Sequence, residues 1–567
     1  MFVLKLLPAI CLLGFFQRTT APPTPSAPSA KPQVAEPSYF RISGRVIDAD
    51  SGQPLARAFV EINLSNSLGP PNAQDSAHVE VTGTDGTFVF TGVLPGKYVL
   101  SARRRGYIQQ MFQQHETFTT AIVVGPGLES KNLIFGLPPA ASISGNVTDE
   151  GGDPVRHAGV MLFRQTFAGG KRRTFLMRRA STDDEGHYHF GHLAPGSYFV
   201  GISAQPWYAQ HNIRRRIKTE DQQNGEGGLQ PLDEQNQNLD VVYPVTFFAN
   251  AGDLASAAPM TIHSGDSEIA DFRLRPVPAV HMLVKTSAED PRNDANVQVT
   301  QTVAENSSVP INVGIARVER GLVEVTGLPP GQLNLVVNTS ALQGGEWTRR
   351  AQSVQLSGDT EVDATESAPS IVVSGILKMD DDSNVPQPAR VLLRNSTTGV
   401  AFDTAVSPAG EFSFKNSAVA MGDYELMIVE PQALFNKGMS SQNAKTSGRT
   451  LQITTPRDVS VTVTASRGTG RITGFALKNG KPASGAMIVL APQDLHSNPA
   501  LFRRDQADSD GSFTLNAVVP GRYTVVAIEN GWDLEWADPE VLWKYLAGGE
   551  SMQIAPNGKT EVKVKVQ

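Results

Sequence analysis

The stretch TDGTFVFTGVLPGKY at residues 84–98 decides the fold class, because it recurs along the chain. Close copies lie at residues 184–198 and 509–523. Two weaker copies keep the glycine pair but fewer of the other positions. Opening segments such as ISGRVID at residues 42–48 precede the copies. Such self-similarity predicts a chain built from like units rather than from one large domain.

Each part of the stretch has its own backbone chemistry. Asp85-Gly86 supplies a residue that accepts positive φ at a tight hairpin turn. Phe88 and Phe90 alternate with small residues, so both rings should point to one face of a strand. The Pro-Gly pair predicts a type II turn with positive φ at its glycine, followed at once by the next strand. The signature residues of the three clear copies are Gly86, Pro95, Gly96, Tyr98, Gly186, Pro195, Gly196, Tyr198, Gly511, Pro520, Gly521 and Tyr523.

The spacing of strands and turns predicts antiparallel sandwiches. Short alternating segments recur every 8–12 residues, and a helical period is almost absent. The units start near residues 42, 143, 280, 371 and 472. The long second interval holds a polar insertion at residues 212–240, which we interpret as a mobile loop. Proline segments between units predict a semi-rigid rod.

Composition narrows the classes of protein. The chain has 567 residues, room for about four domains, and its 51 glycines and 38 prolines suit many short strands and turns. A net charge of −7 argues against a nucleic-acid-binding protein. The single cysteine, Cys11, excludes a disulfide framework and a thiolate zinc site.

The N-terminus has the pattern of an export signal. One lysine precedes an apolar run at residues 6–16, which is too short to span a bilayer. A linker rich in Pro, Ala and Ser follows at residues 22–38. Cys11 lies within the apolar run without the small residue that lipidation requires just before it, so we do not predict a lipid anchor. No later stretch reaches 18 apolar residues, so no transmembrane helix is expected after the signal.

The opening SGxVxD with GxPL and the closing DGxFxF with LPGxY resemble the carboxypeptidase regulatory-like domain. This resemblance implies a prealbumin-like sandwich related to starch-binding-like folds, and similar multi-copy chains occur among secreted proteins of Acidobacteria-type bacteria. We therefore expect an all-β tandem array of about five antiparallel prealbumin-like or Ig-like β-sandwiches. The expected divisions are a signal peptide at 1–21, a linker at 22–38, and sandwiches at 39–138, 139–277, 278–369, 370–468 and 469–567. The third sandwich is degenerate and the fifth carries a short C-terminal helix.

Catalytic motifs are lacking in the sequence. Catalytic zinc carboxypeptidases need His-x-x-Glu, which does not occur among the ten histidines. His187 and His189 share a strand face, but Tyr188 and Phe190 claim the core side, so the histidines should face water. Acidic loops such as the one at residues 380–382 lack the full calcium-binding pattern. We predict no catalytic residue, no metal site and no cofactor.

Aromatic and basic residues offer the remaining candidate sites. Sugars stack their apolar face on exposed aromatic rings, and this makes Trp207, Tyr208 and Trp532 candidate ligand-binding residues. Asp538 followed by Pro539 predicts a helix start, and a short helix covering the last sandwich would bury Trp536 and Trp543. Arginine clusters at 103–105, 172–173, 178–179 and 214–216 are solvated strand ends or, alternatively, contacts to an acidic surface.

These features predict a secreted, periplasmic or cell-surface protein without catalysis. We expect a structural, adhesive or protein-binding role at the cell envelope. A carbohydrate-binding protein is the first alternative, and a hydrolase accessory protein is the second. The expected partner is a polysaccharide or an envelope protein, and no nucleic acid is expected.

Overall fold

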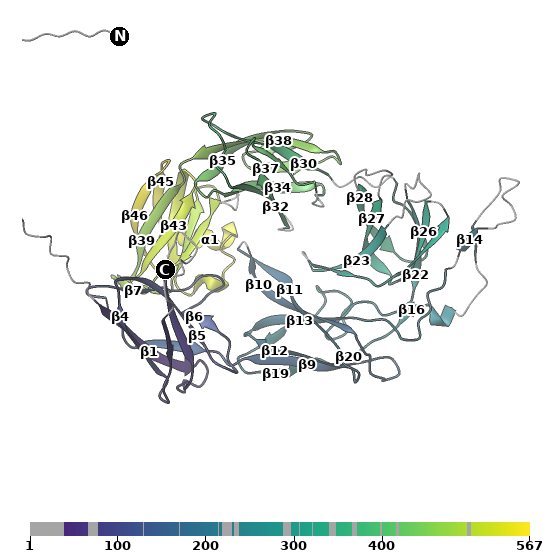
Figure 1. Cartoon of the computed structure of the whole chain (residues 1–567), viewed down its shortest axis with the longest axis horizontal. Coiled ribbons are helices and arrows are strands. Elements are labelled where there is room, and N and C mark those ends of the chain that lie inside the picture. Colours follow the sequence, from purple (N-terminus) through teal and green to yellow (C-terminus); the bar gives the residue numbers. More distant parts are fainter. Residues whose placement is uncertain are drawn as a thin grey trace, which may run out of the picture.

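The computed structural model describes residues 39–567 except 66–77, 129, 169, 214, 218–228, 232–236, 287–295, 305–306, 320, 340–347, 366–370, 397–399, 416–418 and 496–500. These residues form five units of two packed sheets (Figure 1). The predicted all-β sandwich class is confirmed. The predicted signal peptide, the linker, Cys11 and most of the polar insertion lie outside the described residues. Among the described residues, no helix is long and apolar enough to span a membrane.

Unit 1 and unit 2 contain the best copies of the repeat. The strands of unit 1 are β1 (Phe40–Asp48), β2 (Phe59–Leu64), β3 (His78–Val81), β4 (Thr87–Val93), β5 (Gly96–Arg103), β6 (Gln110–Met111), β7 (Ile122–Val124) and β8 (Leu133–Leu137). Those of unit 2 are β9 (Ala141–Thr148), β10 (Gly159–Ala168), β11 (Lys171–Ser181), β12 (His187–Leu193), β13 (Gly196–Ser203), β14 (Arg215–Ile217), β15 (Leu229–Pro231), β16 (Val241–Val242), β17 (Thr246–Phe247), β18 (Met260–Ile262), β19 (Ser267–Ile269), β20 (Phe272–Arg273) and β21 (Val277–Pro278), with a 3₁₀ turn, η1, at Gln237–Leu239.

Units 3 to 5 complete the chain. Unit 3 has β22 (Val280–Lys285), β23 (Asn296–Ala304), β24 (Ser307–Pro310), β25 (Gly314–Glu319), β26 (Leu322–Leu328), β27 (Gly331–Thr339), β28 (Thr348–Leu356) and β29 (Thr360–Asp363). Unit 4 has β30 (Val373–Met379), β31 (Ala389–Asn395), β32 (Ala401–Val406), β33 (Glu411–Ser413), β34 (Gly422–Glu430), β35 (Leu434–Gln442), β36 (Lys445–Ser447), β37 (Thr450–Ile453) and β38 (Val459–Arg467). Unit 5 has β39 (Gly470–Lys478), β40 (Lys481–Pro482), β41 (Met487–Pro492), β42 (Arg503–Gln506), β43 (Ser512–Val518), β44 (Gly521–Ile528), β45 (Glu550–Ile554) and β46 (Lys559–Lys565), with η3 at Gly531–Asp533 and α1 at Pro539–Leu546.

The sheets are antiparallel except where the first strand of a unit pairs in parallel with a strand near the end of the same unit. Examples are β1 with β8 and β39 with β46, and in unit 2 the strand β9 pairs in this way with both β19 and β20. The glycine of the opening Ser-Gly motif lies at this pairing. In unit 4 a Cβ on Gly375 would stand 2.1 Å from the carbonyl oxygen of Val461 and 2.8 Å from the ring of Phe412. The opening glycine is therefore required by the close approach of a strand and an aromatic ring.

The predicted Asp-Gly turn is confirmed. Gly86 has φ +74° and closes the turn by donating its amide to the carbonyl oxygen of Gly83 at 3.0 Å. Gly186 and Gly511 adopt φ +77° and +79° at the same position. Phe88 and Phe90 are both 3% exposed, as the alternation predicts.

The type II turn predicted at the Pro-Gly pairs is wrong: the φ of Gly96 and of Gly521 is not positive, and the φ of Gly196 is +158°, which is extended backbone. The three glycines begin strands β5, β13 and β44 instead. A tyrosine two residues later folds back over the glycine, and a Cβ on Gly521 would stand 3.3 Å from the ring of Tyr523.

That tyrosine hydroxyl donates to the carbonyl oxygen four residues before it. The distance is 3.1 Å in Tyr98, 2.7 Å in Tyr198 and 2.8 Å in Tyr523. In the closing motif the tyrosine side chain thus fixes the segment that leads into the strand, and we call this residue the anchoring tyrosine. The glycine of the motif leaves room for the ring, and a buried hydroxyl is satisfied by a main-chain acceptor.

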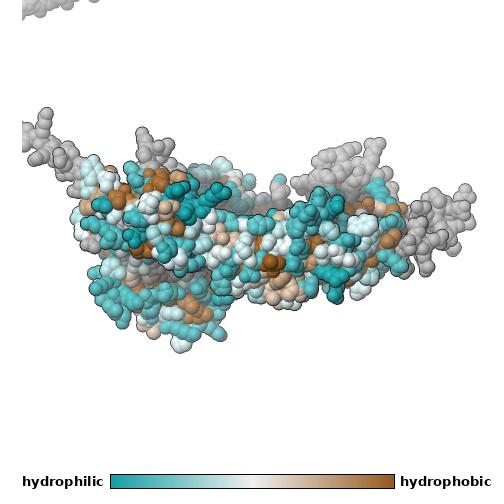
Figure 2. Space-filling view, turned by 90° about the horizontal axis from the view of Figure 1, so that it is seen from below, coloured by the Kyte–Doolittle hydropathy of each residue, from teal (hydrophilic) through white to brown (hydrophobic). Residues whose placement is uncertain are grey.

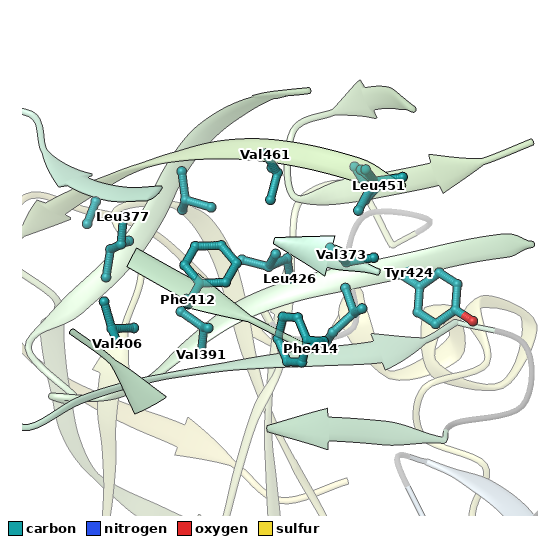
Figure 3. Close-up of a cluster of buried hydrophobic side chains, with 14 of the residues drawn as sticks. Val373, Leu377, Val391, Val406, Phe412, Phe414, Tyr424, Leu426, Leu451 and Val461 are labelled. Atoms are coloured by element: carbon teal, nitrogen blue, oxygen red, sulfur yellow. The ribbon is translucent and has the colours of Figure 1, made fainter. Parts of the chain in front are cut away.

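Each unit buries its own core between its two sheets. In unit 4 the core holds Phe412, Phe414 and Tyr424 among aliphatic side chains from both sheets (Figure 3). Units 1, 2 and 5 have the same combination of aromatic and aliphatic residues. The core cluster of unit 3 is aliphatic, with Leu333 where the other units carry the anchoring tyrosine.

The units do not form the expected rod but a closed ring, in which unit 5 returns to unit 1 (Figure 1). Lys97 in β5 pairs with Asp508, and the Nζ–Oδ2 distance is 2.5 Å. The amide of Val123 donates to Ser509 Oγ at 2.8 Å, and the amide of Ser509 donates to the carbonyl oxygen of Ala121 at 3.0 Å. The prediction of a rod failed because proline hinges fix local stiffness but do not reveal which surfaces meet.

The contact between units 1 and 5 also has a buried polar centre. Gln506 is 1% exposed and donates its Nε2 to the carbonyl oxygen of Gln113 at 2.6 Å and to Thr120 Oγ1 at 2.8 Å. Its Oε1 lies 3.2 Å from His115 Nδ1. Arg504 makes two hydrogen bonds to Glu116, at 3.0 and 2.7 Å. The surface around the ring is largely hydrophilic in the view from below (Figure 2).

A second contact reaches across the ring from unit 2. The β10–β11 hairpin points toward α1 (Figure 1), and the amide of Arg172 donates to Glu535 Oε1 at 3.3 Å. Units 2 and 3 share an apolar cluster in which Phe163 of β10 packs with Val303 and Val309. The ring is therefore held together by contacts between consecutive units as well as between units far apart in sequence.

Candidate functional site

An exposed tryptophan stands at the end of unit 2, where the chain leaves β13. The side chain of Trp207 is 85% exposed, the largest exposure among the large hydrophobic residues that the structure describes. Beside it lies a pocket of about 450 Å³, whose wall includes Asp149, Asp153, Arg156 and Tyr243. The wall also includes Gln205, whose Nε2 donates to the carbonyl oxygen of Asn312 in unit 3 at 2.8 Å.

The indole is braced from behind by a fixed tyrosine. The rings of Trp207 and Tyr208 meet edge to face with centroids 5.7 Å apart. The hydroxyl of Tyr208 donates to Glu150 Oε1, and the hydroxyl of Tyr243 donates to Glu150 Oε2 at 2.8 Å. Arg273 Nη2 donates to the carbonyl oxygen of Glu150 at 2.7 Å. The Glu150 carboxylate thus connects both tyrosines to the turn that follows β9. It holds in place the aromatic pair Trp207 and Tyr208, which we call the Trp207 platform.

Burial and hydrogen bonding act in opposite directions on this carboxylate. Burial alone would raise the pKa of Glu150, but hydrogen bonds from Tyr208, the main chain and Tyr243 together keep it below its ordinary value. Burial and the neighbouring Glu150 charge raise the pKa of Tyr208 to about 12. Burial also raises the pKa of Tyr243. Both phenols therefore remain hydrogen-bond donors to an ionised Glu150 at neutral pH.

The arrangement suits binding rather than catalysis. An exposed indole offers an apolar face to a ring-shaped ligand. Asp149 and Asp153 stand in the same pocket wall and could accept hydrogen bonds from hydroxyl groups. The Asp149 carboxylate already accepts the amides of Gly151 and Asp153, at 2.9 and 2.8 Å, which fixes the loop.

Trp532 is not an exposed platform, which corrects its prediction as a ligand-binding residue. It is 6% exposed and stacks on His115 of unit 1 with centroids 4.8 Å apart and ring planes 5° apart. Its Nε1 donates to the carbonyl oxygen of Gly485 at 3.1 Å. Phe118 of unit 1 also packs against this indole, with ring centroids 5.5 Å apart, so the ring is buried in the contact between units. The sequence could not show this because the partner lies more than 400 positions away.

The predicted C-terminal helix exists as α1, with Asp538 as its N-cap accepting the amide of Glu540 at 2.9 Å. Trp536 precedes the helix and is 7% exposed, as expected for core packing. Trp543 is 62% exposed, which corrects its predicted burial. The helix begins at Pro539, so Trp536 lies outside it and the two residues do not share one helical face.

The histidine cluster of β12 and the arginine Arg178 were also considered as candidate sites. His187 and His189 are exposed while Tyr188 and Phe190 are buried, as predicted. Within the described residues, no group of three or more His, Cys, Asp or Glu is placed to hold a metal ion. Arg178 donates to the carbonyl oxygens of residues 191 and 192, which anchors it to its own unit.

Sequence reasoning missed Glu150 and Tyr243, which hold the Trp207 platform. Glu150 follows the repeated aspartate of the opening segment, a position that differs among the copies. Tyr243 lies beyond the polar insertion, 93 positions from Glu150. The position of Glu150 in a turn is the only feature of the sequence that could have suggested its role. Its contact with Tyr243 could not be predicted because the two residues are far apart in sequence.

Comparison with known protein families finds a match for two segments of the chain. Residues 41–127 and 142–224 match the sequence profile of the carboxypeptidase regulatory-like domain. No curated protein matches the chain. Among solved structures, a streptococcal ancillary pilin is 13% identical, with a TM-score of 0.19, over 51% of this chain and 98% of the pilin. The Bacillus anthracis TIE protein is 8% identical, with a TM-score of 0.15, over 95% of this chain and 76% of that protein.

The resemblance seen in the repeated motifs is thus confirmed where those motifs are clearest in the first half of the chain. The opening and closing segments that carry it fall inside the two matched ranges. These two segments are similar to the carboxypeptidase regulatory-like domain.

Proposed function

We propose that this protein is a secreted or envelope-associated scaffold without catalysis, with a structural or adhesive role. The observation that carries the proposal is the contact between units 1 and 5, which turns a string of sandwiches into a closed frame. A frame of this kind holds its loops at fixed distances from one another. Fixed presentation of several loops suits adhesion to a surface or to a partner protein.

The proposal is tested by adhesion of beads coated with the chain from residue 39. Beads should attach to immobilised envelope polysaccharides or proteins, and the chain should not turn over chromogenic ester, peptide or glycoside substrates. Beads coated with the heat-unfolded chain are the control for non-specific attachment. Attachment equal to that control, or steady substrate turnover by the pure protein, would contradict the proposal.

A second candidate function is carbohydrate binding at Trp207. The specific observation in its favour is an 85% exposed indole, braced by Tyr208 and standing beside a pocket with carboxylate acceptors. Sugars bind such sites through stacking of their CH-rich face and hydrogen bonds from their hydroxyls. Because the platform is preformed, binding would not need to order it.

The chain offers a matched control for this site. Trp207→Ala and Trp543→Ala each remove an exposed indole, at 85% and 62% exposure, and only the first stands beside the pocket. In a titration with soluble polysaccharides followed by calorimetry, Trp207→Ala should abolish saturable binding and Trp543→Ala should leave it intact. Equal binding by both variants would place any sugar site elsewhere.

A further inference from the structure

The hairpin formed by β10 and β11 concentrates positive charge in a chain whose net charge is −7. Residues 159–181 contain no Asp or Glu, and their cations are Arg164, Lys171, Arg172, Arg173, Arg178 and Arg179. All but the first lie in β11, the edge strand of a sheet with the order β11-β10-β13-β17. Lys171, Arg172 and Arg179 are exposed. At a sheet edge, side chains from both faces can reach a partner that lies along the strand.

Most of this positive charge has no carboxylate partner in the described part of the chain. Ion pairs with described residues are lacking for Arg164, Lys171, Arg172, Arg178 and Arg179. Elsewhere exposed cations do form such pairs, as Lys437 does with Asp380 at 2.9 Å. Two carboxylates of the turn after β11, Asp183 and Glu185, contact His187 Nδ1 at 3.6 Å.

Two of the arginines are held in place by neutral acceptors. Arg178 donates Nη1 to the carbonyl oxygen of Gly191 at 2.7 Å and Nη2 to that of His192 at 3.1 Å. Arg164 donates Nη2 to the carbonyl oxygen of Pro195 at 2.9 Å. These bonds restrict both guanidinium groups without cancelling their charge, so less side-chain entropy is lost when an anion binds.

Protection of the sheet edge is the simpler reason for charge on β11, because charged side chains hinder pairing with a further strand. That function is served by charges of either sign. The exposed strand β46 mixes both signs, with Glu561 between Lys559 and Lys563, whereas β11 carries one sign only. Edge protection alone therefore does not explain the composition of β11, and recognition of an acidic partner does.

The spacing of the cations favours an extended partner. Lys171 and Arg179 stand near opposite ends of β11, roughly 26 Å apart along the strand. One carboxylate or phosphate headgroup cannot contact both ends, whereas a polymer with repeated charges can. Met177 lies between them with 41% of its surface exposed, and it offers an apolar contact to the CH-rich face of a sugar ring.

The position of the hairpin suits a narrow chain. It extends from unit 2 into the ring toward α1 (Figure 1), and near its tip the amide of Arg172 donates to Glu535 Oε1 at 3.3 Å. Neighbouring units beside the hairpin favour a flexible polymer over a flat bilayer. We propose that β11 binds a linear polysaccharide that carries carboxylate groups, through Lys171, Arg172, Arg178 and Arg179. This names a partner for the adhesive role proposed above and rests on that role.

Calorimetric titration of the full chain tests the proposal with polygalacturonate, its fully methyl-esterified form, oligothymidylate, and vesicles of equal parts phosphatidylcholine and phosphatidylserine. Polygalacturonate should bind at least about tenfold tighter than the methyl ester, because the ester keeps the sugar backbone and loses the charge. The double variant Lys171→Gln/Arg179→Gln should weaken this binding about fivefold to thirtyfold. The control Lys563→Gln/Lys565→Gln removes two exposed charges from β46 and should bind as the wild type does.

Equal affinity for polygalacturonate and its methyl ester, or unchanged binding by Lys171→Gln/Arg179→Gln, would overturn the proposal. Tighter binding of oligothymidylate or of the vesicles would overturn the choice of partner. Loss of polygalacturonate binding in Trp207→Ala would place the polymer at the Trp207 platform instead. If the double variant fails to fold by circular dichroism, Arg179→Gln alone should weaken binding about twofold to fivefold.

The outcomes also separate this site from the proposed function. Coated beads that attach to the envelope panel, with no binding of polygalacturonate in solution, would reject the site and leave the adhesive role standing. Binding of polygalacturonate that depends on β11, with no attachment of beads, would reject the adhesive role and leave the site standing.

Discussion

Gln506 is the residue whose replacement should open the ring without unfolding a unit. Its side chain is 1% exposed and joins Gln113, Thr120 and His115 of unit 1. Its main chain belongs to β42, which pairs with β41 inside unit 5. Gln506→Leu keeps the approximate volume of the side chain and removes only its polar atoms.

The cost follows from the groups left behind. The carbonyl oxygen of Gln113 and the His115 Nδ1 each lose their bond to Gln506, and Thr120 Oγ1 keeps only its bond to the carbonyl oxygen of Ala507 at 3.3 Å. An unsatisfied buried polar group costs about 1–3 kcal/mol, so the two groups left without this partner weaken the closed state by about 2–6 kcal/mol. The open state should therefore gain about thirtyfold or more in population relative to the closed state.

Hydrogen exchange followed by mass spectrometry measures this opening. The amides of Ala121, Val123 and Ser509 donate across the contact and should exchange at least about thirtyfold faster in the variant. The amide of Val46, which donates to Gly86 within unit 1, should be unchanged. Gln442→Leu, at an exposed position of β35, is the control. Unchanged protection at all three amides in Gln506→Leu would refute the role given to this contact.

Three further variants test other parts of the structure. Gly375→Ala should destabilise unit 4 by at least about 2 kcal/mol in urea unfolding, since its Cβ would meet the carbonyl oxygen of Val461 at 2.1 Å, whereas Gly438→Ala meets nothing within 4 Å and should be nearly neutral. His281→Leu should cost about 1.5–3 kcal/mol, because the 4% exposed ring contacts Glu324 at 2.8 Å and Asp240 at 2.9 Å, and its loss removes one charge-assisted hydrogen bond from each buried carboxylate; a thermal unfolding change below 1 kcal/mol, or about 3 °C, would contradict this. Burial raises the pKa of Asp505 from 3.8 to about 6, so the folded protein binds a proton that the unfolded chain does not between these values, and stability should fall as pH rises through that window. Asp505→Asn should flatten this pH dependence in urea unfolding, and an unchanged slope would show that another group causes it.

The repeat predicted the units because each motif acts within its own sandwich. The Asp-Gly turn and the alternating aromatic residues depend on neighbours a few positions away, and both are present as expected. The Pro-Gly prediction failed although it is equally local, because the glycine is explained by the ring of Tyr523 rather than by its own φ. The Pro-Gly motif correctly predicted where the next strand starts, but the backbone geometry predicted for its glycine was wrong.

Contacts between units could not be predicted from the motifs. Gln506 and Trp532 meet residues almost 400 or more positions away, and no pattern of hydrophobicity marks them as contact residues. Trp207 could be proposed because an aromatic pair after a strand and before a polar stretch is unusual within a sandwich. Its support by Glu150 and Tyr243 required the fold.

Small-angle X-ray scattering of the chain from residue 39 tests the closed ring most directly. A compact protein of this length has a radius of gyration of roughly 24 Å, and a ring should lie slightly above it, near about 30 Å. Five units of at least about 30 Å in an open rod would give about 45 Å and a maximum dimension near 150 Å. A radius near 30 Å for the wild type and a clear increase in Gln506→Leu support the account. A wild-type radius near 45 Å would contradict it.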